Sequence, residues 1–444
     1  MRVSDDQHAS HAGGPAFVPP RGQIRSDQRR IRSTTAFAPR FFGRSPELSA
    51  DIAFLAGHGI PERILRSATL LASCRGTNPS QELFAAGFDR LRYWQILAEH
   101  LGLPFFADLA DASLHIHAGT LTTDAVRLAA SVRVVRNGAL MLVVAPGRDE
   151  IPRLAHHLST NPAAAGQVAI AAPETIRAFL LERRHTALTH YAVNRLSHVL
   201  PRLSARRLRA VEPEGAVALL GALSGLCLLA PGSALFGLGT LLTLFFCNCA
   251  FWKAAAAVSR PAPLRLEAVP SILLPTYTIL VPLYREEAIV ADLVRHLAGI
   301  DYPASKLQIL LLLEADDVET TIAAACLAEQ PIFELVILPP GGPRTKPKAL
   351  TFALPFARGD LVVVYDAEDR PEPDQLRKAA AAFRERPGLG CVQAGLAPDN
   401  EDCALAKLFT IEYSANFQVL LPALSRWQVP LPLGGTSNHF PGIR

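Results

Sequence analysis

Three carboxylates stand directly after an apolar stretch in the C-terminal half of the chain, as Asp366, Glu368 and Asp369. The stretch before them, 361–365, is rich in β-branched residues and is typical of a buried strand. Carboxylates are costly to bury without partners, so we expect them at the exposed end of that strand. Open α/β sheets bind ligands at the carboxyl ends of parallel strands, and clustered carboxylate oxygens suit Mg²⁺ or Mn²⁺. The pattern predicts a metal and diphosphate site, with a solvated acidic turn as the alternative.

A second acidic turn and a basic stretch extend this pattern. The apolar run 307–313 ends in a further group of carboxylates, which are Glu314, Asp316 and Asp317. If both runs are strands of one sheet, both acidic turns lie at the same edge of it. The basic stretch 344–348 stands between the two turns in the sequence and precedes a predicted helix. Because cations and a helix N-terminus both favour phosphate, we expect its lysines, Lys346 and Lys348, to favour a phosphate group, with a solvated surface charge as the alternative for one of the two.

Strands and helices alternate from residue 277 onward. The expected strands are 277–283, 307–313, 333–338, 361–365 and 389–394. The expected helices are 286–297, 319–328, 347–356 and 373–383. Such alternation predicts an α/β fold with a mostly parallel sheet and right-handed crossovers.

Composition limits the classes of function. The chain has 444 residues, of which 50% are hydrophobic, so we expect two or three domains. A formal net charge of +4 is too small to indicate a nucleic-acid partner. The seven cysteines include no CxxC pair, which indicates a reducing compartment.

A long segment, 215–252, contains no charged residue. As one helix it would extend about 57 Å, nearly twice the ~30 Å core of a bilayer. The residues at 231–233, Pro-Gly-Ser, interrupt it, so we predict a transmembrane hairpin with passes at about 215–231 and 234–252. Basic residues on both flanks place both flanks in the cytoplasm. The alternative is a pair of buried core helices.

The N-terminal part of the chain predicts a small soluble α/β domain. Apolar runs at 132–135 and 139–145 flank Asn137 and Gly138, which predicts a β-hairpin with a tight turn. A predicted strand at 168–171 and a helix follow. This layout resembles the N-terminal domain of type II secretion ATPases, some of which bind cyclic di-GMP. The arginine- and glycine-bearing signature of the binding forms is not found here, so the resemblance implies a docking or regulatory domain.

These patterns divide the chain into six parts. They are a disordered tail (1–44), a small soluble α/β docking or regulatory domain (45–184), a basic amphipathic juxtamembrane segment (185–214), the transmembrane hairpin (215–252), a linker (253–275) and a C-terminal α/β domain (276–444). The expected location is the inner membrane of the cell, crossed more than once, with the soluble domains in the cytoplasm.

Five segments in order between residues 277 and 440 resemble the membrane-bound family 2 glycosyltransferases, which share a GT-A fold with cellulose and hyaluronan synthases. The matching segments are Val281–Glu287, the acidic turn 314–317, Lys346–Leu350, Tyr365–Asp369 and Gly434–His439. The resemblance implies inverting transfer of a sugar from a nucleotide-diphosphate donor, UDP-linked, to a growing polysaccharide or glycan, with Mg²⁺ or Mn²⁺ as cofactor. The implied partners are the donor, a glycan acceptor, the lipid bilayer and proteins of an export system.

The resemblance also implies roles for individual residues. The donor site would be formed by Glu286, Glu314, Asp316, Asp317, Lys346, Lys348 and Asp366. The metal would be held by Asp366, Glu368 and Asp369. The acceptor would lie at the loop formed by Gly434, Gly435, Thr436 and Ser437.

Departures from the family pattern bear on activity. The family's general base, an Asp in a Thr-Glu-Asp-like segment, and its Gln-x-x-Arg-Trp segment do not occur up to Arg444, so the base is expected beyond that residue. Glu368 stands at the far end of the DxD-like motif, and Thr351 replaces an Asn common after Lys-x-x-Ala-Leu. The expectation is a truncated chain that binds donor and turns over poorly or not at all. The alternative function is a non-catalytic membrane scaffold or cyclic-dinucleotide sensor of a polysaccharide-export system.

Overall fold

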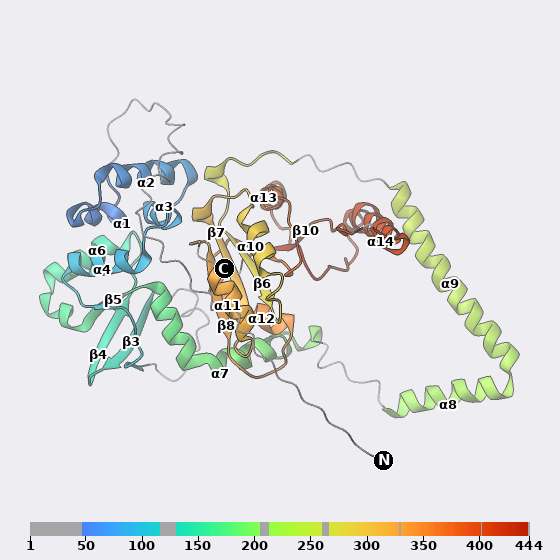
Figure 1. The fold of residues 1–444 in the computed structure, drawn as a ribbon. Coiled ribbons are helices and arrows are strands. Elements are labelled where there is room, and N and C mark those ends of the chain that lie inside the picture. The colour runs from blue at the N-terminus through green and yellow to red at the C-terminus, as the bar shows by residue number, and fades with distance from the viewer. Residues whose placement is uncertain are drawn as a thin grey trace, which may run out of the picture. The chain divides into compact units, whose positions relative to one another are not determined.

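The computed structural model describes residues 47–115, 130–204, 213–259, 266–327, 330–400 and 402–442 (Figure 1). The chain divides into two units, Met1–Ser45 and Pro46–Arg444. The predicted disordered tail, 1–44, lies outside the described residues. The other domain limits proposed from the sequence remain predictions.

The first sheet has five strands in the order β1-β5-β4-β3-β2. Its strands are β1 (Phe105–Phe106), β2 (Ser113–Leu114), β3 (Ser131–Arg136), β4 (Ala139–Val144) and β5 (Val168–Ala171). The helices around it are α1 (Ala50–Ala53), η2 (Phe54–His58), α2 (Glu62–Arg75), α3 (Pro79–Ala85), α4 (Arg90–Leu101), α6 (Glu150–Thr160), η3 (Pro162–Gln167), α7 (Pro173–Val199) and η4 (Pro201–Leu203). The predicted hairpin is confirmed, because Asn137 (φ 51°) and Gly138 (φ 77°) form the two-residue turn between β3 and β4.

Helix α7 links this region to the second sheet. Its apolar residues continue past residue 184, and the buried ones include Ile176, Leu180 and Leu188. They share one hydrophobic core with Ala349 and Phe352 of helix α12 (Lys346–Ala353). The limits predicted at 184 and 185 therefore fall inside a continuous helix, because its buried stripe does not stop there. Residues 205–212 of the predicted juxtamembrane segment lie outside the described residues.

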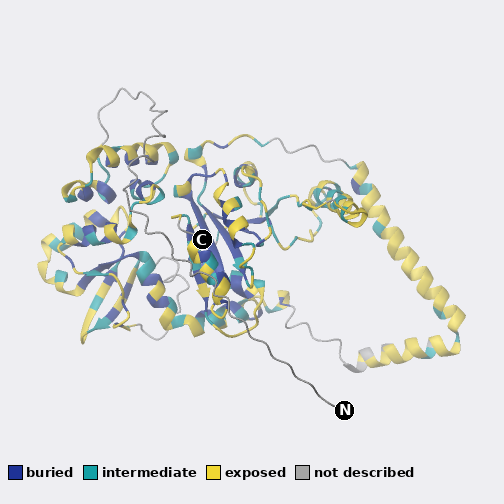
Figure 2. Ribbon diagram, in the orientation of Figure 1, coloured by how far each residue is buried: buried dark blue, intermediate teal, exposed yellow. Residues whose placement is uncertain are grey.

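Two apolar helices, α8 (Pro213–Leu229) and α9 (Pro231–Val258), follow. They separate at Ala230, whose φ of −144° is not helical, and Pro231 begins α9 because proline is tolerated in a first helical turn. The break predicted at 231–233 therefore lies at Ala230, and residues 231–233 form the start of α9. Among the described residues, α9 is the one helix long and apolar enough to cross a membrane, while the apolar part of α8, Leu220–Leu229, is shorter. Most of their side chains are exposed (Figure 2).

The second sheet has the order β10-β11-β9-β6-β7-β8. Its strands are β6 (Tyr277–Leu283), β7 (Leu307–Glu314), β8 (Phe333–Leu338), β9 (Leu361–Val364), β10 (Val392–Gln393) and β11 (Asn438–Pro441). β9, β6, β7 and β8 run parallel, and β11 is antiparallel to both of its neighbours. The predicted α/β fold with a mostly parallel sheet is confirmed. Parallel strands covered on both faces are near-continuous apolar runs, and every residue of β7 is buried, including its two polar residues, Gln308 and Glu314.

The remaining helices connect and follow these strands. They are η6 (Ser271–Leu273), α10 (Val290–Ala298), η7 (Ala304–Lys306), α11 (Val318–Leu327), η8 (Leu354–Phe356), α13 (Gln375–Glu385), α14 (Ala404–Ser414), the π-helix η9 (Ala415–Leu420) and α15 (Leu421–Arg426). The helix expected from 286 begins at Val290, because Arg285 has a left-handed φ of 59° and ends the strand in a turn. The expected strand 389–394 is shorter, at Val392–Gln393.

The approach to β9 leaves no room for a side chain at Gly359. A Cβ there would lie 2.4 Å from the Leu361 carbonyl oxygen and 2.4 Å from the Thr278 amide nitrogen. Because both atoms belong to paired backbone, Gly359→Ala should lower the free energy of unfolding by about 1–3 kcal/mol. The shift of the thermal midpoint of the full chain measures this effect. Gly390→Ala is the matched control, since a Cβ there meets nothing within 4 Å, and equal midpoints for the two variants would contradict the prediction.

Candidate functional site

Acidic residues from three neighbouring parallel strands come together at one edge of the second sheet. β6 lies between β7 and β9, and the acidic turns follow the carboxyl ends of all three strands. Burial raises the pKa of Glu286, and repulsion from Glu368 and Asp366 raises it further. The predicted acidic turns are therefore close enough to act on one carboxyl group, which makes this edge an unbalanced negative site.

The basic stretch 344–348 joins both acidic turns. Each of its three cations pairs with a different carboxylate. The pairs are Arg344 with Asp316 (2.8 Å), Lys346 with Asp366, and Lys348 with Glu314 (2.8 Å). Pro347 stands in the first turn of α12, where its missing N–H costs nothing, so the helix can start at Lys346. One helix start thereby cross-links the ends of β7 and β9.

The three pairs differ in burial, and this separates structural residues from accessible ones. Lys348 and Glu314 are 4% and 7% exposed, so each satisfies the other inside the protein. Removing either partner would leave a buried unpaired charge. The side chains of Lys346 and Asp366 are each 30% exposed, and Asp316 is more open still. Glu314 and Lys348, which the sequence analysis predicted to contact the donor, therefore pair with each other inside the protein.

Asp317 has a structural position that the sequence analysis missed. One of its carboxylate oxygens accepts from the amide of Arg285 (2.5 Å) and the other from the amide of Thr320 (3.3 Å). Burial raises the pKa of Asp317, but these hydrogen bonds outweigh burial and lower it. Asp317 thus caps α11 and holds the left-handed turn at Arg285, so its oxygens are not free for a donor. An aspartate directly before a helix is a capping signal that was available in the sequence.

The predicted acceptor segment folds beside the Asp366 turn. Lys346 donates to the carbonyl oxygen of Gly435 (2.7 Å), and the Thr436 hydroxyl donates to Asp369. Asp369 also accepts from the amide of Asp366 (2.7 Å). Burial raises the pKa of Asp369 against the lowering effect of the hydrogen bond from Thr436. Asp369 therefore fixes the turn that presents Asp366.

The metal site predicted at Asp366, Glu368 and Asp369 is not preassembled. Among the described residues, no group of three or more His, Cys, Asp or Glu side chains is arranged to hold a metal ion. Because Asp369 is held by hydrogen bonds, the carboxylates available at this turn are Asp366 and the exposed Glu368. Glu286 lies near both of them.

A strand begins directly after the predicted acceptor loop. Gly434 and Gly435 precede β11, Ser437 is buried with a left-handed φ of 54°, and Asn438 begins β11. The sequence analysis did not predict this strand, which pairs with both β9 and β10.

His439 belongs to the core and not to the acidic edge. It is 1% exposed, and its Nδ1 lies 2.6 Å from the hydroxyl of Tyr277. Burial lowers the pKa of His439 from 6.5 to about 4, so the ring is neutral at pH 7. The ring anchors β11 against β6 and is unsuited to accept a proton from a bound substrate.

Comparison with known proteins identifies this region. Residues 275–430 match the family model described as "Glycosyltransferase like family 2". This segment is similar to family 2 glycosyltransferase domains. Its parallel strands and C-terminal ligand edge agree with the GT-A type of α/β fold expected from the sequence.

Individual relatives of the glycosyltransferase domain cover limited parts of the chain. The beta-monoglucosyldiacylglycerol synthase of Trichormus variabilis is 30% identical over 122 residues, which is 27% of this chain and 26% of the relative. The Pyrobaculum calidifontis mannosyltransferase in complex with GDP-Man and Mn²⁺ is 26% identical, covers 36% of this chain and 46% of its own, and has a TM-score of 0.32. Glucosyl-3-phosphoglycerate synthase of Mycobacterium tuberculosis, in complex with Mn²⁺, UDP and phosphoglyceric acid, is 17% identical, covers 40% of this chain and 62% of its own, and has a TM-score of 0.28. The chain spans about a quarter of the length of the curated relatives it matches.

Neutral His439 should make the glycosyltransferase domain less stable in acid. As the pH falls from 6.5 to 4, His439 binds a proton in the unfolded chain but not in the folded protein. The free energy of unfolding therefore falls as the pH falls. The loss should approach about 3 kcal/mol. Chemical unfolding at several pH values should show a weaker pH dependence in His439→Gln than in the unsubstituted chain. The exposed His157→Gln variant should keep the full dependence, and parallel curves for all three proteins would refute this assignment.

Removing the charge of Glu286 should stabilise the protein. Because the pKa of Glu286 is raised, its charged form is disfavoured in the folded state, which lowers the free energy of unfolding. This destabilisation is absent below pH 4.5 and grows as the pH rises through the raised pKa. Glu286→Gln should therefore increase the free energy of unfolding at pH 7 and change it little in acid. The measurement is a pair of unfolding curves at the two pH values. A Gln variant that is less stable at pH 7 would show that Glu286 is held by favourable contacts.

Proposed function

We propose that the chain is a membrane-associated glycosyltransferase that moves a sugar from a nucleotide-diphosphate donor, UDP-linked, to an acceptor hydroxyl with inversion. One observation carries the proposal: carboxylates from three neighbouring strand ends meet, and the cations of 344–348 join those that follow the two outer strands, β7 and β9. Mixed charges at this edge suit a charged diphosphate together with a cation. The family match over 275–430 supports the same reaction class.

The accessible residues divide between the two ends of the donor. Asp316, at the end of β7, is placed to accept hydrogen bonds from ribose hydroxyls or a base. Lys346 pairs with Asp366 and the Gly435 carbonyl, so its ammonium lies where a diphosphate would compete for it. Asp317 and Asp369 act as positioning residues, because their oxygens hold the turns that carry these groups.

The residues fit a divalent cation at the Asp366 turn. Glu286, Glu368 and Asp366 repel one another, and a cation would relieve that repulsion. Asp366 and Glu368 would hold it, and both are oxygen donors suited to Mg²⁺ or Mn²⁺. When bound, the ion would stabilise negative charge on the departing diphosphate. Lys346 would supply a second positive charge to the same group.

The acceptor is proposed to lie at the surface of a bilayer. The 28-residue helix α9 is apolar and exposed along most of its length. Helix α14 exposes further large apolar residues, which are Leu405, Leu408, Phe409 and Ile411. The segment after α14 contacts the end of α9, with Trp427 and Trp252 ring centroids 5.6 Å apart. This apolar surface and the name of the Trichormus relative favour a lipid hydroxyl, and a growing glycan is the second candidate.

The multi-pass arrangement also belongs to this proposal. Helix α8 is shorter than a full bilayer span, and a hairpin would require it to pair with α9 in the membrane. Soluble regions on the cytoplasmic side follow from the basic flanks. Protease protection of the two flanks in sealed vesicles would test this orientation.

Sugar transfer is tested with membranes that contain the chain and radiolabelled UDP-glucose, with lipid-extractable and polymeric products counted separately. Asp366→Asn should reduce incorporation roughly 100-fold or more, because the proposed ion and Lys346 both lose their carboxylate partner. Chelation of divalent cations should abolish incorporation, and Mn²⁺ or Mg²⁺ should restore it. Asp399→Asn is the matched control, because Asp399 is exposed and pairs with Arg370. Equal incorporation by both variants would end the claim for this site, and no incorporation by the unsubstituted chain would favour the non-catalytic alternative.

A further inference from the structure

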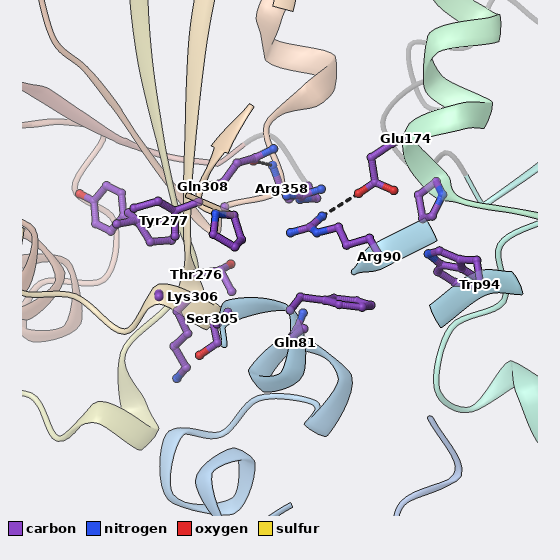
Figure 3. A pocket seen from close by; sticks show the side chains of 18 residues that line it. Gln81, Arg90, Trp94, Glu174, Thr276, Tyr277, Ser305, Lys306, Gln308 and Arg358 are labelled. Atoms are coloured by element: carbon purple, nitrogen blue, oxygen red, sulfur yellow. Dashed lines mark hydrogen bonds and ion pairs between the residues drawn. The ribbon is translucent and has the colours of Figure 1, made fainter. Parts of the chain in front are cut away.

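A cavity of about 260 Å³ lies at the opposite edge of the second sheet, where β6 and β7 begin. One wall comes from helices of the N-terminal region and carries Phe84, Arg90, Trp94 and Glu174. The other wall carries Thr276, Ser305, Gln308 and Arg358 (Figure 3). The cavity shares no residue with the acidic edge, and its size suits a small metabolite.

Positive charge is in excess at this cavity. Arg90 pairs with Glu174 (2.6 Å). Glu334, behind the cavity wall, pairs with two arginines, Arg358 and Arg177, the second at 3.3 Å. Three guanidinium groups therefore share two carboxylates. Figure 3 shows Arg90 and Arg358 entering the same part of the pocket from opposite walls.

Hydrogen-bonding capacity remains unused around the same space. Arg90 pairs with Glu174 through Nη1 alone, and Arg358 pairs with Glu334 through Nη2 alone, so further N–H donors remain on each fork. The buried Oγ of Ser305 and Oε2 of Glu174 have no hydrogen-bond partner among the described residues. Buried polar atoms without partners are uncommon and costly.

Aromatic side chains close the remaining wall. The Arg90 guanidinium lies 5.2 Å from the centroid of the Phe84 ring, and Trp94 is 7% exposed. An apolar wall beside two guanidinium forks lowers the local dielectric and strengthens their attraction for an anion. Lys306 does not add a third cation to the two arginines, because its ammonium donates to the carbonyl oxygens of Ser271, Ile272 and Leu274.

We propose that this cavity binds a small phosphorylated polyol. The phosphate is held by the unused N–H groups of Arg90 and Arg358, which match its oxygens in geometry and charge. A hydroxyl group of the same ligand donates to Glu174 Oε2, which lies beside Arg90. Such a ligand touches helices of the N-terminal region and strands of the glycosyltransferase domain, so its binding holds the two together.

The test is calorimetric titration of the full chain in detergent with glycerol 3-phosphate, and with inorganic phosphate and glycerol as partial ligands. Glycerol 3-phosphate should bind more tightly than either partial ligand. Arg90→Gln should weaken its binding about tenfold or more, since a charge-assisted hydrogen bond is lost. Ser305→Leu should also weaken it by filling the cavity without removing charge.

Two controls separate this cavity from other anion sites. Arg92→Gln, on the same helix but outside the cavity, should bind as the unsubstituted chain does. Asp366→Asn, at the acidic edge, should also leave binding unchanged, so failure of the glycosyltransferase proposal does not affect this result. The proposal would be overturned by absence of binding at millimolar concentration. It would also be overturned if Arg90→Gln and Ser305→Leu bound glycerol 3-phosphate as tightly as the unsubstituted chain, or if inorganic phosphate bound as tightly as glycerol 3-phosphate.

Discussion

Mutual repulsion among carboxylates is the constraint on which the functional edge of this protein depends. Parallel pairing of β9, β6 and β7 forces three acidic turns to one side, where water alone screens them incompletely. The basic stretch 344–348 offsets this repulsion by pairing with both outer turns. Negative charge remains uncompensated around Glu286, whose pKa is raised. That residual negative charge supports the proposed binding of a cation at this edge.

Support for the basic stretch comes from the N-terminal region. Helix α7 packs against α12, which begins with the lysines, and a Cβ at Gly342 would lie 3.3 Å from Val193 of α7. Near its start, α7 also contributes Arg177 to a buried network that includes Glu334 and Gln308. Burial raises the pKa of Glu334, but Arg358 and Arg177 outweigh it and lower the pKa. One helix therefore contacts both ends of the second sheet, which offers a physical route by which the N-terminal region can influence the proposed donor site.

Most elements of the second sheet could be predicted from hydrophobic periodicity, and so could the convergence of its acidic turns. Runs such as 309–313 are apolar at every position, as expected for a strand covered on both faces. The role of each carboxylate could not be predicted in the same way. Asp316 and Asp317 are adjacent, yet one is accessible at the edge and the other caps a helix, because Arg285 and Thr320 reach only the second.

The sequence by itself determined the fold class, the strand ends that carry acid and the basic stretch between them, because these follow from local periodicity and the alternation of strands with helices. Tertiary structure alone decided which lysine is buried against Glu314, that Asp369 holds the turn beneath Asp366, and that the segment after Ser437 is a strand. It also created the arginine-lined cavity, whose walls are far apart in the chain. Burial and pairing of a polar atom depend on neighbours from distant segments, and no local pattern encodes them.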